Sequence, residues 1–457
     1  MGHAGIAQER AENRLRLTSL DEPAQGTEQA DAVTTAEPAA REFVSTSLVA
    51  VDGPTMSLAE IEATAIERNP TIRQASAVAQ KAVGTRQQVG LCPNPSIGYS
   101  GQEIGDNGDY GQQGLYVEQT YVRGDKLQLN QNIADQEVQR LLWQVQVQRQ
   151  RVLTDVRRQY YATLGAQLRM AMTQELEGLA ADAADKFRLL FENQQGSRAD
   201  QLQAEVLQSE ISILRQQAAN ERDANWRQLA NLMGIPAMQP VTLAGDLEDG
   251  GAPREWDQSV THLLSTSPQL QQAYAEAQRA YATIRRAQVQ KVPNVDVQAS
   301  VMHMAESDNV GANLMIGLPI PFFNKNQGNV HSAWSEYHRA QNNVQRLTLS
   351  TQARLAEAFG DYRDAAIRVN VMQQEILPRQ AESVELIEKG FGTQFDFLRL
   401  FSARRNYYES RVQYLNALVA LRQQEVLIDG LLLTGAFDEV EDTVIDDGMR
   451  DAALDGR

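Results

Sequence analysis

The sequence predicts a mainly α-helical protein made of two copies of one unit, in which a long antiparallel coiled-coil helical hairpin carries a β-hairpin. Three observations lead to this fold class. Several stretches recur in the same order about 198 residues later, and the longest segments repeat apolar residues at steps of three and four. Short segments alternate strictly between apolar and polar residues. The first observation indicates an internal duplication, the second coiled-coil helices and the third β-strands.

The duplication is seen in three stretches whose offsets are 198, 199 and 196 residues. Because the offsets hardly change, only small insertions separate the two copies. The matched stretches are 80–82 with 278–280, 124–126 with 323–325, and Gly196, Asp200 and Leu202 with Gly392, Asp396 and Leu398. The expected organisation is an N-terminal segment at 1–55, a first repeat at 56–235, a linker at 236–254, a second repeat at 255–434 and an acidic C-terminal tail at 435–457.

The two ends of the chain differ from the repeats in composition. The first 55 residues are rich in Ala, Glu, Gln, Thr and Asp and lack apolar periodicity, so we expect disorder there. They contain no basic start followed by an apolar core, so the sequence as given shows no secretory signal. From Ala436 onward, eight acidic residues face two arginines, which predicts a solvated tail.

Each repeat is expected to open with a helix and continue into a β-hairpin. Ser57 and Glu60 form a capping-box pattern that starts the first helix, and Pro93 and Pro95 stop it. Turn residues at 105–109 and 306–309 predict the two hairpins.

Two pairs of long helices follow, at about 125–192 and 198–233 in the first copy and 326–389 and 394–432 in the second. At 1.5 Å per residue, the longer helix of each pair reaches about 100 Å. Pro378 predicts a kink or break near the end of the 326–389 helix. The apolar stripes on these helices indicate packing against neighbouring helices, because a hairpin this long cannot bury itself as a compact globule.

The strands place apolar residues on one face and polar residues on the other. Ten alternating residues is about the length of a tilted strand that crosses a bilayer. Four strands cannot close a barrel, whereas three chains supply about twelve, so the apolar face is expected to meet lipid and the polar face a lumen. The expected lipid-facing residues are Val295, Val297, Ala299, Val301, Leu314, Ile316, Leu318 and Ile320.

Composition and motifs argue against several function classes. The net charge of -17 disfavours nucleic acid as a partner. We find no phosphate-binding loop and no nucleophile elbow, so we expect neither enzymatic activity nor a cofactor. A metal site is not expected either: in a strand, Met302 and Met304 point to one face and His303 to the other.

Four motifs in this order resemble the outer-membrane factor (TolC-like) family of efflux channels, over roughly residues 56–434. They are PNP at 93–95, LPIPFFNKNQG at 318–328, EILPRQ at 375–380, and the glycine-containing helical tips. The resemblance implies a homotrimer whose helices form an α-barrel tunnel through the periplasm and whose strands form a twelve-stranded β-barrel in outer-membrane lipid. It also implies a periplasmic adaptor protein and an inner-membrane pump as partners.

The resemblance assigns roles to two further groups of residues. The tips expected to dock the adaptor are Gln195, Gly196, Ser197 and Arg198 in copy one and Phe391, Gly392, Thr393 and Gln394 in copy two. The alternative is that these are only turns. The residues expected to narrow the tunnel as acidic rings are Glu382, Glu385 and Glu388, which step by three along one face of the 326–389 helix. The alternative is that they form only a solvated helix face.

The function predicted in this way is a passive outer-membrane conduit of a tripartite export system. A cytoplasmic, self-associating coiled-coil scaffold without transport activity is the alternative, because the sequence as given shows no export signal. Two alternating hairpins at equivalent places favour the channel, since a scaffold has no use for them.

Overall fold

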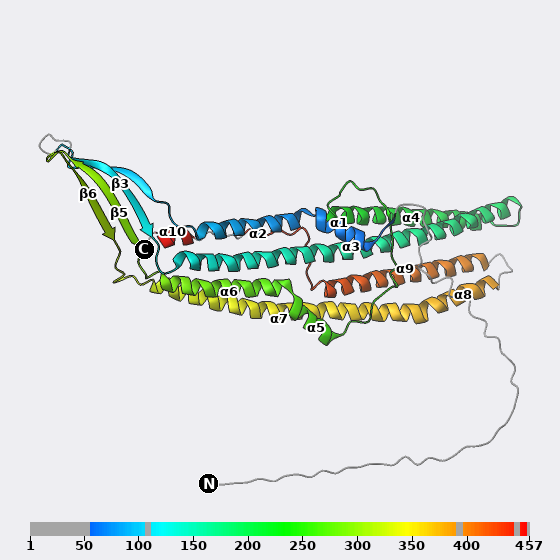
Figure 1. The fold of residues 1–457 in the computed structure, drawn as a ribbon. Coiled ribbons are helices and arrows are strands. Elements are labelled where there is room, and N and C mark those ends of the chain that lie inside the picture. Colours follow the sequence, from blue (N-terminus) through cyan, green and yellow to red (C-terminus); the bar gives the residue numbers. More distant parts are fainter. Residues whose placement is uncertain (1–54, 106–110, 390–395, 443–447, 455–457) are drawn as a thin grey trace, which may run out of the picture. The chain divides into compact units, whose positions relative to one another are not determined.

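The computed structural model describes residues 55–105, 111–389, 396–442 and 448–454 (Figure 1). Three predictions therefore lie outside the described residues. They concern the disorder of the N-terminal segment, most of the first hairpin turn, and the second helical tip at Phe391–Gln394. The described residues all belong to one unit that spans residues 46–457.

The same order of elements occurs in both halves of the described chain. The first half contains α1 (Leu58–Arg68), α2 (Pro70–Val89), β2 (Ser96–Gln102), β3 (Gln112–Tyr121), α3 (Lys126–Glu192) and α4 (Arg198–Leu232). The second half contains α5 (Trp256–Thr266), α6 (Pro268–Val289), β5 (Val295–Met304), β6 (Asn309–Gly317), α7 (Gln327–Val371), a π turn (Met372–Ile376), α8 (Leu377–Lys389) and α9 (Asp396–Asp429). Two short strands, β1 (Thr55–Met56) and β4 (Thr242–Leu243), and a short helix, α10 (Met449–Leu454), complete the described elements.

The opening helix of each repeat is two helices, so the prediction of a single one is wrong. The capping box at Ser57 is confirmed, since Ser57 and Glu60 each accept from the other's backbone N–H. The break comes at Asn69, because Pro70 keeps the residue before it out of the helical region. Asn69 accepts a hydrogen bond from the Thr71 N–H (3.0 Å) and donates one to the Leu232 carbonyl (3.1 Å). It therefore caps α2 and fastens it to the end of α4.

The long helices agree closely with the prediction. The α3 helix begins one residue later than expected and ends at Glu192 as predicted. The disturbance expected near Pro378 is a π turn immediately before it, at Met372–Ile376. Proline has no N–H to donate and its ring clashes with the carbonyl four residues earlier, and a wider turn relieves both. The described helices contain no stretch that is both long and apolar enough to span a membrane.

The two hairpins form a single four-stranded antiparallel sheet with the order β2-β3-β5-β6. The pair β3–β5 joins copy one to copy two, so the sheet unites the repeats. In this register Leu115 lies opposite Val301, and Val297 lies opposite Ile316. The chain enters the sheet from α2 and α6 and leaves it into α3 and α7, and Figure 1 shows the strands beyond these helix ends. The side-chain alternation predicted for each strand is thus aligned across all four.

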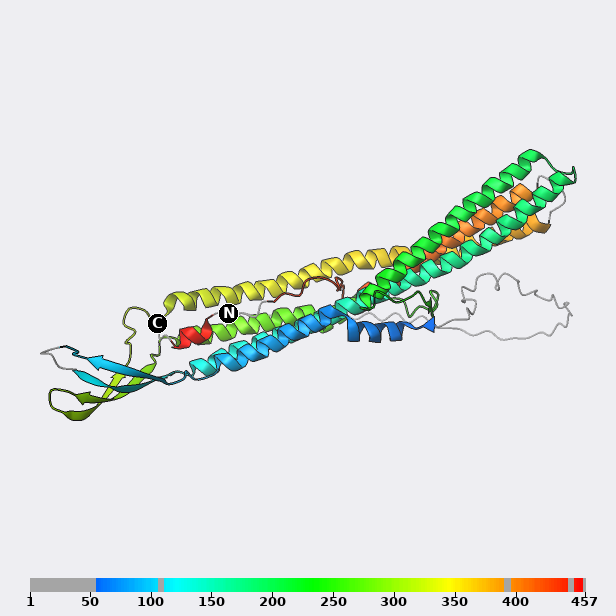
Figure 2. The same ribbon diagram turned by 90° about the horizontal axis from the view of Figure 1, so that it is seen from above.

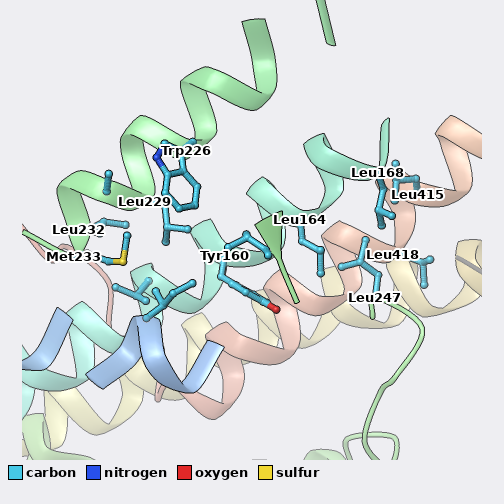
Figure 3. Close-up of a cluster of buried hydrophobic side chains, with 14 of the residues drawn as sticks. Tyr160, Leu164, Leu168, Trp226, Leu229, Leu232, Met233, Leu247, Leu415 and Leu418 are labelled. Atoms are coloured by element: carbon cyan, nitrogen blue, oxygen red, sulfur yellow. The ribbon is translucent and has the colours of Figure 1, made fainter. Parts of the chain in front are cut away.

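The largest hydrophobic cluster lies where α1, α3, α4 and α9 meet (Figure 3). Trp226 is 2% exposed, and its indole N–H donates to the Met238 carbonyl at 3.0 Å. Leu243 and Leu247 in the inter-repeat linker are completely buried in the same cluster. The linker is therefore part of the core, and it packs α3 of the first repeat against α9 of the second.

The residues after Ala436 are not simply a solvated tail, and that expectation is wrong for the described part. Val440 and Ala453 are buried. The side chains of Asn130 and Gln144 on α3 donate to the carbonyls of Met449 and Glu441, both at 3.0 Å. The acidic composition made this segment look solvated, yet its backbone carbonyls and small apolar side chains pack onto the helices.

Candidate functional site

One face of the sheet is apolar and exposed in the single chain; we call it the apolar sheet face. Leu115, Val301 and Ile316 are 63%, 57% and 63% exposed. Since cross-strand partners lie on the same face, the register collects these side chains into one continuous surface. Its exposed large members are Ile97, Tyr99, Leu115, Val117, Tyr121, Val301, Val310, Leu314 and Ile316, with Ala299 exposed and Val295 and Val297 half-buried among them. A contiguous surface of this kind marks a place where lipid or protein binds.

Leu318 and Ile320 do not belong to a strand, because β6 ends at Gly317. Pro319 and Pro321 have no N–H for a ladder, and this ends the strand. Leu318 and Ile320 are nevertheless exposed, as are Phe322 and Phe323, whose rings pack edge to face at 5.0 Å. The segment therefore extends the exposed apolar surface beyond the sheet toward α7. Contact of either residue with lipid stays a prediction.

The opposite face of β5 is polar and more enclosed. The Thr120 hydroxyl donates to the Asp296 carboxylate at 2.6 Å, and Ser300 is buried. Met302 lies on this face, whereas His303 lies on the other and contacts Asp308 at 3.0 Å. As predicted, the Met-His-Met stretch does not converge on one point. In the described part of the chain, no group of three or more His, Cys, Asp or Glu side chains has the arrangement of a metal site.

Both outer strands of the sheet have an open edge. Within the described residues, β2 pairs only with β3, and β6 pairs only with β5. An open edge presents unpaired N–H and carbonyl groups that bind another strand readily. The sheet thus combines two open edges with an exposed apolar face. Within the described part of a single chain, the edges have no strand partner and the face is not covered.

The first helical tip is a tight reversal between α3 and α4. Gln194 adopts a left-handed conformation (φ 57°), and the Gln195 N–H donates to the Leu190 carbonyl at 2.8 Å. These are the features of a Schellman helix end. A Cβ at Gly196 would lie 3.0 Å from the Leu190 Cβ, so glycine fits the close approach.

The residues that start α4 complete this tip. Ser197 caps the helix by accepting from the Ala199 N–H at 3.1 Å. The Arg198 guanidinium lies over the Phe191 ring, 5.6 Å from its centroid. Gln195, Ser197 and Arg198 are all exposed. The tip is therefore an ordered, accessible surface with one fixed cation.

The acidic stripe consists of Glu382, Glu385 and Glu388 on α8, all exposed. Glu385 is ion-paired with Lys389 on the same helix, and Glu388 with Arg404 on α9. Among the described residues, only Glu382 of the three has no ion-pair partner. Much of the negative charge that the sequence suggested for this face is therefore balanced within the chain.

Two buried cations at the base of the sheet were missed by sequence reasoning. The Lys126 ammonium, on a side chain that is 0% exposed, donates to the Asn294 amide oxygen at 2.8 Å. The Arg286 guanidinium donates to the Asn130 amide oxygen at 2.7 Å. Burial, with the nearby charge of Arg286, lowers the pKa of Lys126 to about 8, and burial lowers the pKa of Arg286 to about 10. A lysine in a polar helix gives no sequence signal of burial.

Comparison with known proteins agrees with this geometry. Residues 260–432 match the family model described as outer membrane efflux protein. The match covers less than half of the chain. The resemblance predicted from the motifs is confirmed. One curated relative is the cobalt-zinc-cadmium resistance protein CzcC of Cupriavidus metallidurans. It is 23% identical over 274 residues, which are 60% of this chain and 65% of the length of CzcC.

Solved structures show the same fold for most of the chain. The open state of the MtrE outer membrane channel of Neisseria gonorrhoeae aligns with a TM-score of 0.66 at 16% identity, covering 84% of this chain and 90% of MtrE. CusC, whose structures describe transmembrane channel formation, aligns with a TM-score of 0.66 at 14% identity, covering 85% and 96%. The mainly helical fold with a small sheet, predicted from sequence, is thus that of a chain of these channels.

Proposed function

We propose that this protein is a homotrimeric outer-membrane efflux channel, a passive conduit in a tripartite export system. The observation that carries the proposal is the four-stranded sheet, which has two open edges and one exposed apolar face. In a bilayer, every backbone N–H and carbonyl needs a partner, so an open sheet is not tolerated there. Three copies provide twelve strands, with β6 of each chain pairing with β2 of the next, and no edge is left.

In such a barrel the two faces of the sheet have different neighbours. The apolar sheet face contacts the hydrocarbon, and each square ångström removed from water contributes about 25 cal/mol. The opposite face, with Asp296, Gln298 and Ser300, lines a water-filled lumen. The aromatic residues Tyr121, Phe322 and Phe323 lie at strand ends or just beyond, where aromatic side chains prefer the membrane interface.

The helices continue the lumen as a tunnel that crosses the periplasm. Their tips, 195–198 and 391–394, dock a periplasmic adaptor, which connects the channel to an inner-membrane pump. The ordered reversal at Gly196 supports this, because an exposed glycine turn lets another helix tip approach the backbone closely. The family is one of conduits rather than enzymes, and in this role the work of the chain is geometric.

The alternative of a cytoplasmic scaffold is not favoured by the comparisons. The matched domain and the solved relatives are outer-membrane efflux proteins and channels. A scaffold in water also gains nothing from an exposed apolar sheet face, which promotes aggregation there.

Fractionation and mass determination test the proposal. The chain is expressed behind a working export signal, and the outer membrane is separated from the soluble and inner-membrane fractions. We expect a heat-resistant species in the outer membrane whose protein mass in detergent is about 150 kDa, three times the chain mass of 50.7 kDa. A soluble product of any mass would contradict the channel, and a membrane-bound monomer would contradict closure by three chains.

A further inference from the structure

The junction between the two repeats contains a four-residue ionic network. On α3, Glu137 and Arg140 are paired at 2.7 Å, and on α6, Glu276 and Arg279 are paired at 3.3 Å. The pairs also contact each other: Arg140 lies 3.5 Å from Glu276, and Arg279 lies 3.6 Å from Glu137. All four side chains are at most 20% exposed. Each cation thus contacts two carboxylates, on its own helix and on the facing one.

The second repeat carries the same pair on α7, but among the described residues it forms no direct ion pair with another helix. Glu336 and Arg339 occupy the positions of Glu137 and Arg140 with an offset of 199 residues, and they too are paired. Their side chains are 43% and 63% exposed, whereas those of Glu137 and Arg140 are 7% and 9% exposed. The hydrogen bond from Arg339, together with the charges of Arg339 and of Arg279 on α6, lowers the pKa of Glu336. In the single chain, the α7 face that corresponds to a buried junction is open to solvent.

The matching surface lies on α2. Lys81 occupies the position of Arg279 with an offset of 198 residues, but Val78 stands where α6 has Glu276. The missing carboxylate comes from another part of the chain: Asp442, which follows the buried Val440, pairs with Lys81 at 2.9 Å. Both side chains are 53% exposed. The α2 surface therefore presents one cation and one anion, as α6 does within the chain.

We infer that Glu336 and Arg339 of one protomer bind Lys81 and Asp442 of a second copy of this chain. The inference rests on the proposed trimer. Glu336 pairs with Lys81 and Arg339 with Asp442, which repeats the alternating charges of the junction within the chain. The C-terminal segment that supplies Asp442 is then part of the interface between subunits.

Two further features of the chain agree with this pairing. At the same junction Arg286 on α6 donates to Asn130 on α3, and the corresponding positions on α2 and α7 are Gln88 and Asn329, two exposed amides. In the sheet, β3 of copy one pairs with β5 of copy two, and the open edges β6 and β2 have the corresponding places. One rotation of the chain brings the charged pairs, the amides and the strand edges together.

Cysteine cross-linking tests the inference directly. In a Cys92→Ser background, Lys81→Cys is combined with Glu336→Cys, and the purified membrane protein is treated with a short bismaleimide. We expect covalent trimers on a denaturing gel. The matched control combines Lys81→Cys with His338→Cys, which is also exposed but lies about 200° further around α7. We expect little cross-linking in the control.

The possible outcomes separate this inference from the proposed function. A species of trimer mass in detergent without covalent trimers in the 81/336 variant would overturn the interface and leave the trimer intact. Equal cross-linking of the control would overturn the assigned α7 face. Absence of a trimer in the Cys92→Ser protein itself would overturn both proposals.

A charge exchange tests the role of Asp442. Arg339→Asp and Asp442→Arg are each expected to lower the temperature at which the trimer dissociates in detergent, because each places like charges across the interface. The double variant restores opposite charges, and we expect it to recover the dissociation temperature at least in part. Additive losses in the double variant would show that the two residues do not meet.

Discussion

At the scale of single residues, the most informative side chains are the buried cations at the base of the sheet. Lys126 and Arg286 each contact an amide oxygen, from Asn294 and Asn130 respectively. The same two asparagines donate to carbonyls of the C-terminal segment, at Ala453 and Met449. Each asparagine thus ties a buried cation to the end of the chain, and the desolvated charge costs stability at neutral pH.

Lys126→Met tests this cost through its pH dependence. The pKa of Lys126 is lowered from 10.5 to about 8 in the folded chain. Between these pH values the unfolded chain binds more protons, so the lysine's contribution makes stability rise from about pH 8 to 10.5, by on the order of 3 kcal/mol. We expect thermal melting in detergent to show this rise in the wild type and not in the variant.

Lys291, an exposed lysine between α6 and β5, provides the control. Lys291→Met is expected to keep the rise between pH 8 and 10.5 that the wild type shows. A rise of equal size in Lys126→Met would mean that Lys126 is not the titrating group.

At the scale of elements, the sheet acts through alternation. Because side chains alternate with a period of two, neighbouring residues of one strand meet different surroundings. On β5, Val297 lies on the apolar sheet face and Gln298 on the polar face. The same substitution at these two positions therefore distinguishes lipid from lumen.

Val297→Arg is expected to block membrane assembly. An arginine on the lipid face of a barrel costs about 2–4 kcal/mol at the bilayer midplane, and a trimer carries three of them. We expect heat-resistant trimer in the outer membrane to fall at least tenfold, while Gln298→Arg assembles nearly as well as the wild type. Normal trimer yield from Val297→Arg would count against the barrel.

At the scale of the whole molecule, the proposed function depends on surfaces that no single chain completes. The long helices, seen along their length in Figure 2, place the first tip far from the sheet. Assembly and docking are therefore separable: substitutions at the tip are expected to disturb export without disturbing trimer formation.

Arg198→Glu tests docking at the first tip. Its guanidinium is held over Phe191 and is exposed, so the reversed charge faces any partner that approaches. We expect normal trimer yield and loss of most export activity in cells that carry the matching adaptor and pump. The control is Arg188→Glu, which changes an exposed arginine on α3, and this variant is expected to export normally. Full export by Arg198→Glu would limit this tip to the role of a turn.

Glu382→Gln tests the acidic stripe. Since Glu385 and Glu388 are ion-paired, Glu382 is the member of the stripe expected to supply most of the ring charge in the trimer. We expect reduced cation selectivity of single channels in planar bilayers, with the exposed Glu67 on α1 as the control for Glu→Gln. Unchanged selectivity would favour the solvated-face interpretation.

Much of the fold could be predicted because its signals are local or periodic. The capping box at Ser57, the ends of α3 and the alternation of β5 all depend on residues close in sequence. The break at Asn69 was also local, and the proline signal there was overlooked. The last strand was predicted to continue to Ile320, but β6 ends at Gly317, because hydrophobicity alone does not register a proline that ends a ladder.

By itself, the sequence determined the duplication, the helix and strand pattern, and the apolar face of each hairpin, since periodicity in the chain fixes which side chains share a face. Only the tertiary structure decided which surfaces are buried. It packed the acidic C-terminal segment and Lys126 into the helices, paired Glu388 with Arg404, and left Glu336 and Arg339 exposed where their counterparts are covered. Burial depends on neighbours distant in sequence, and no local pattern encodes them.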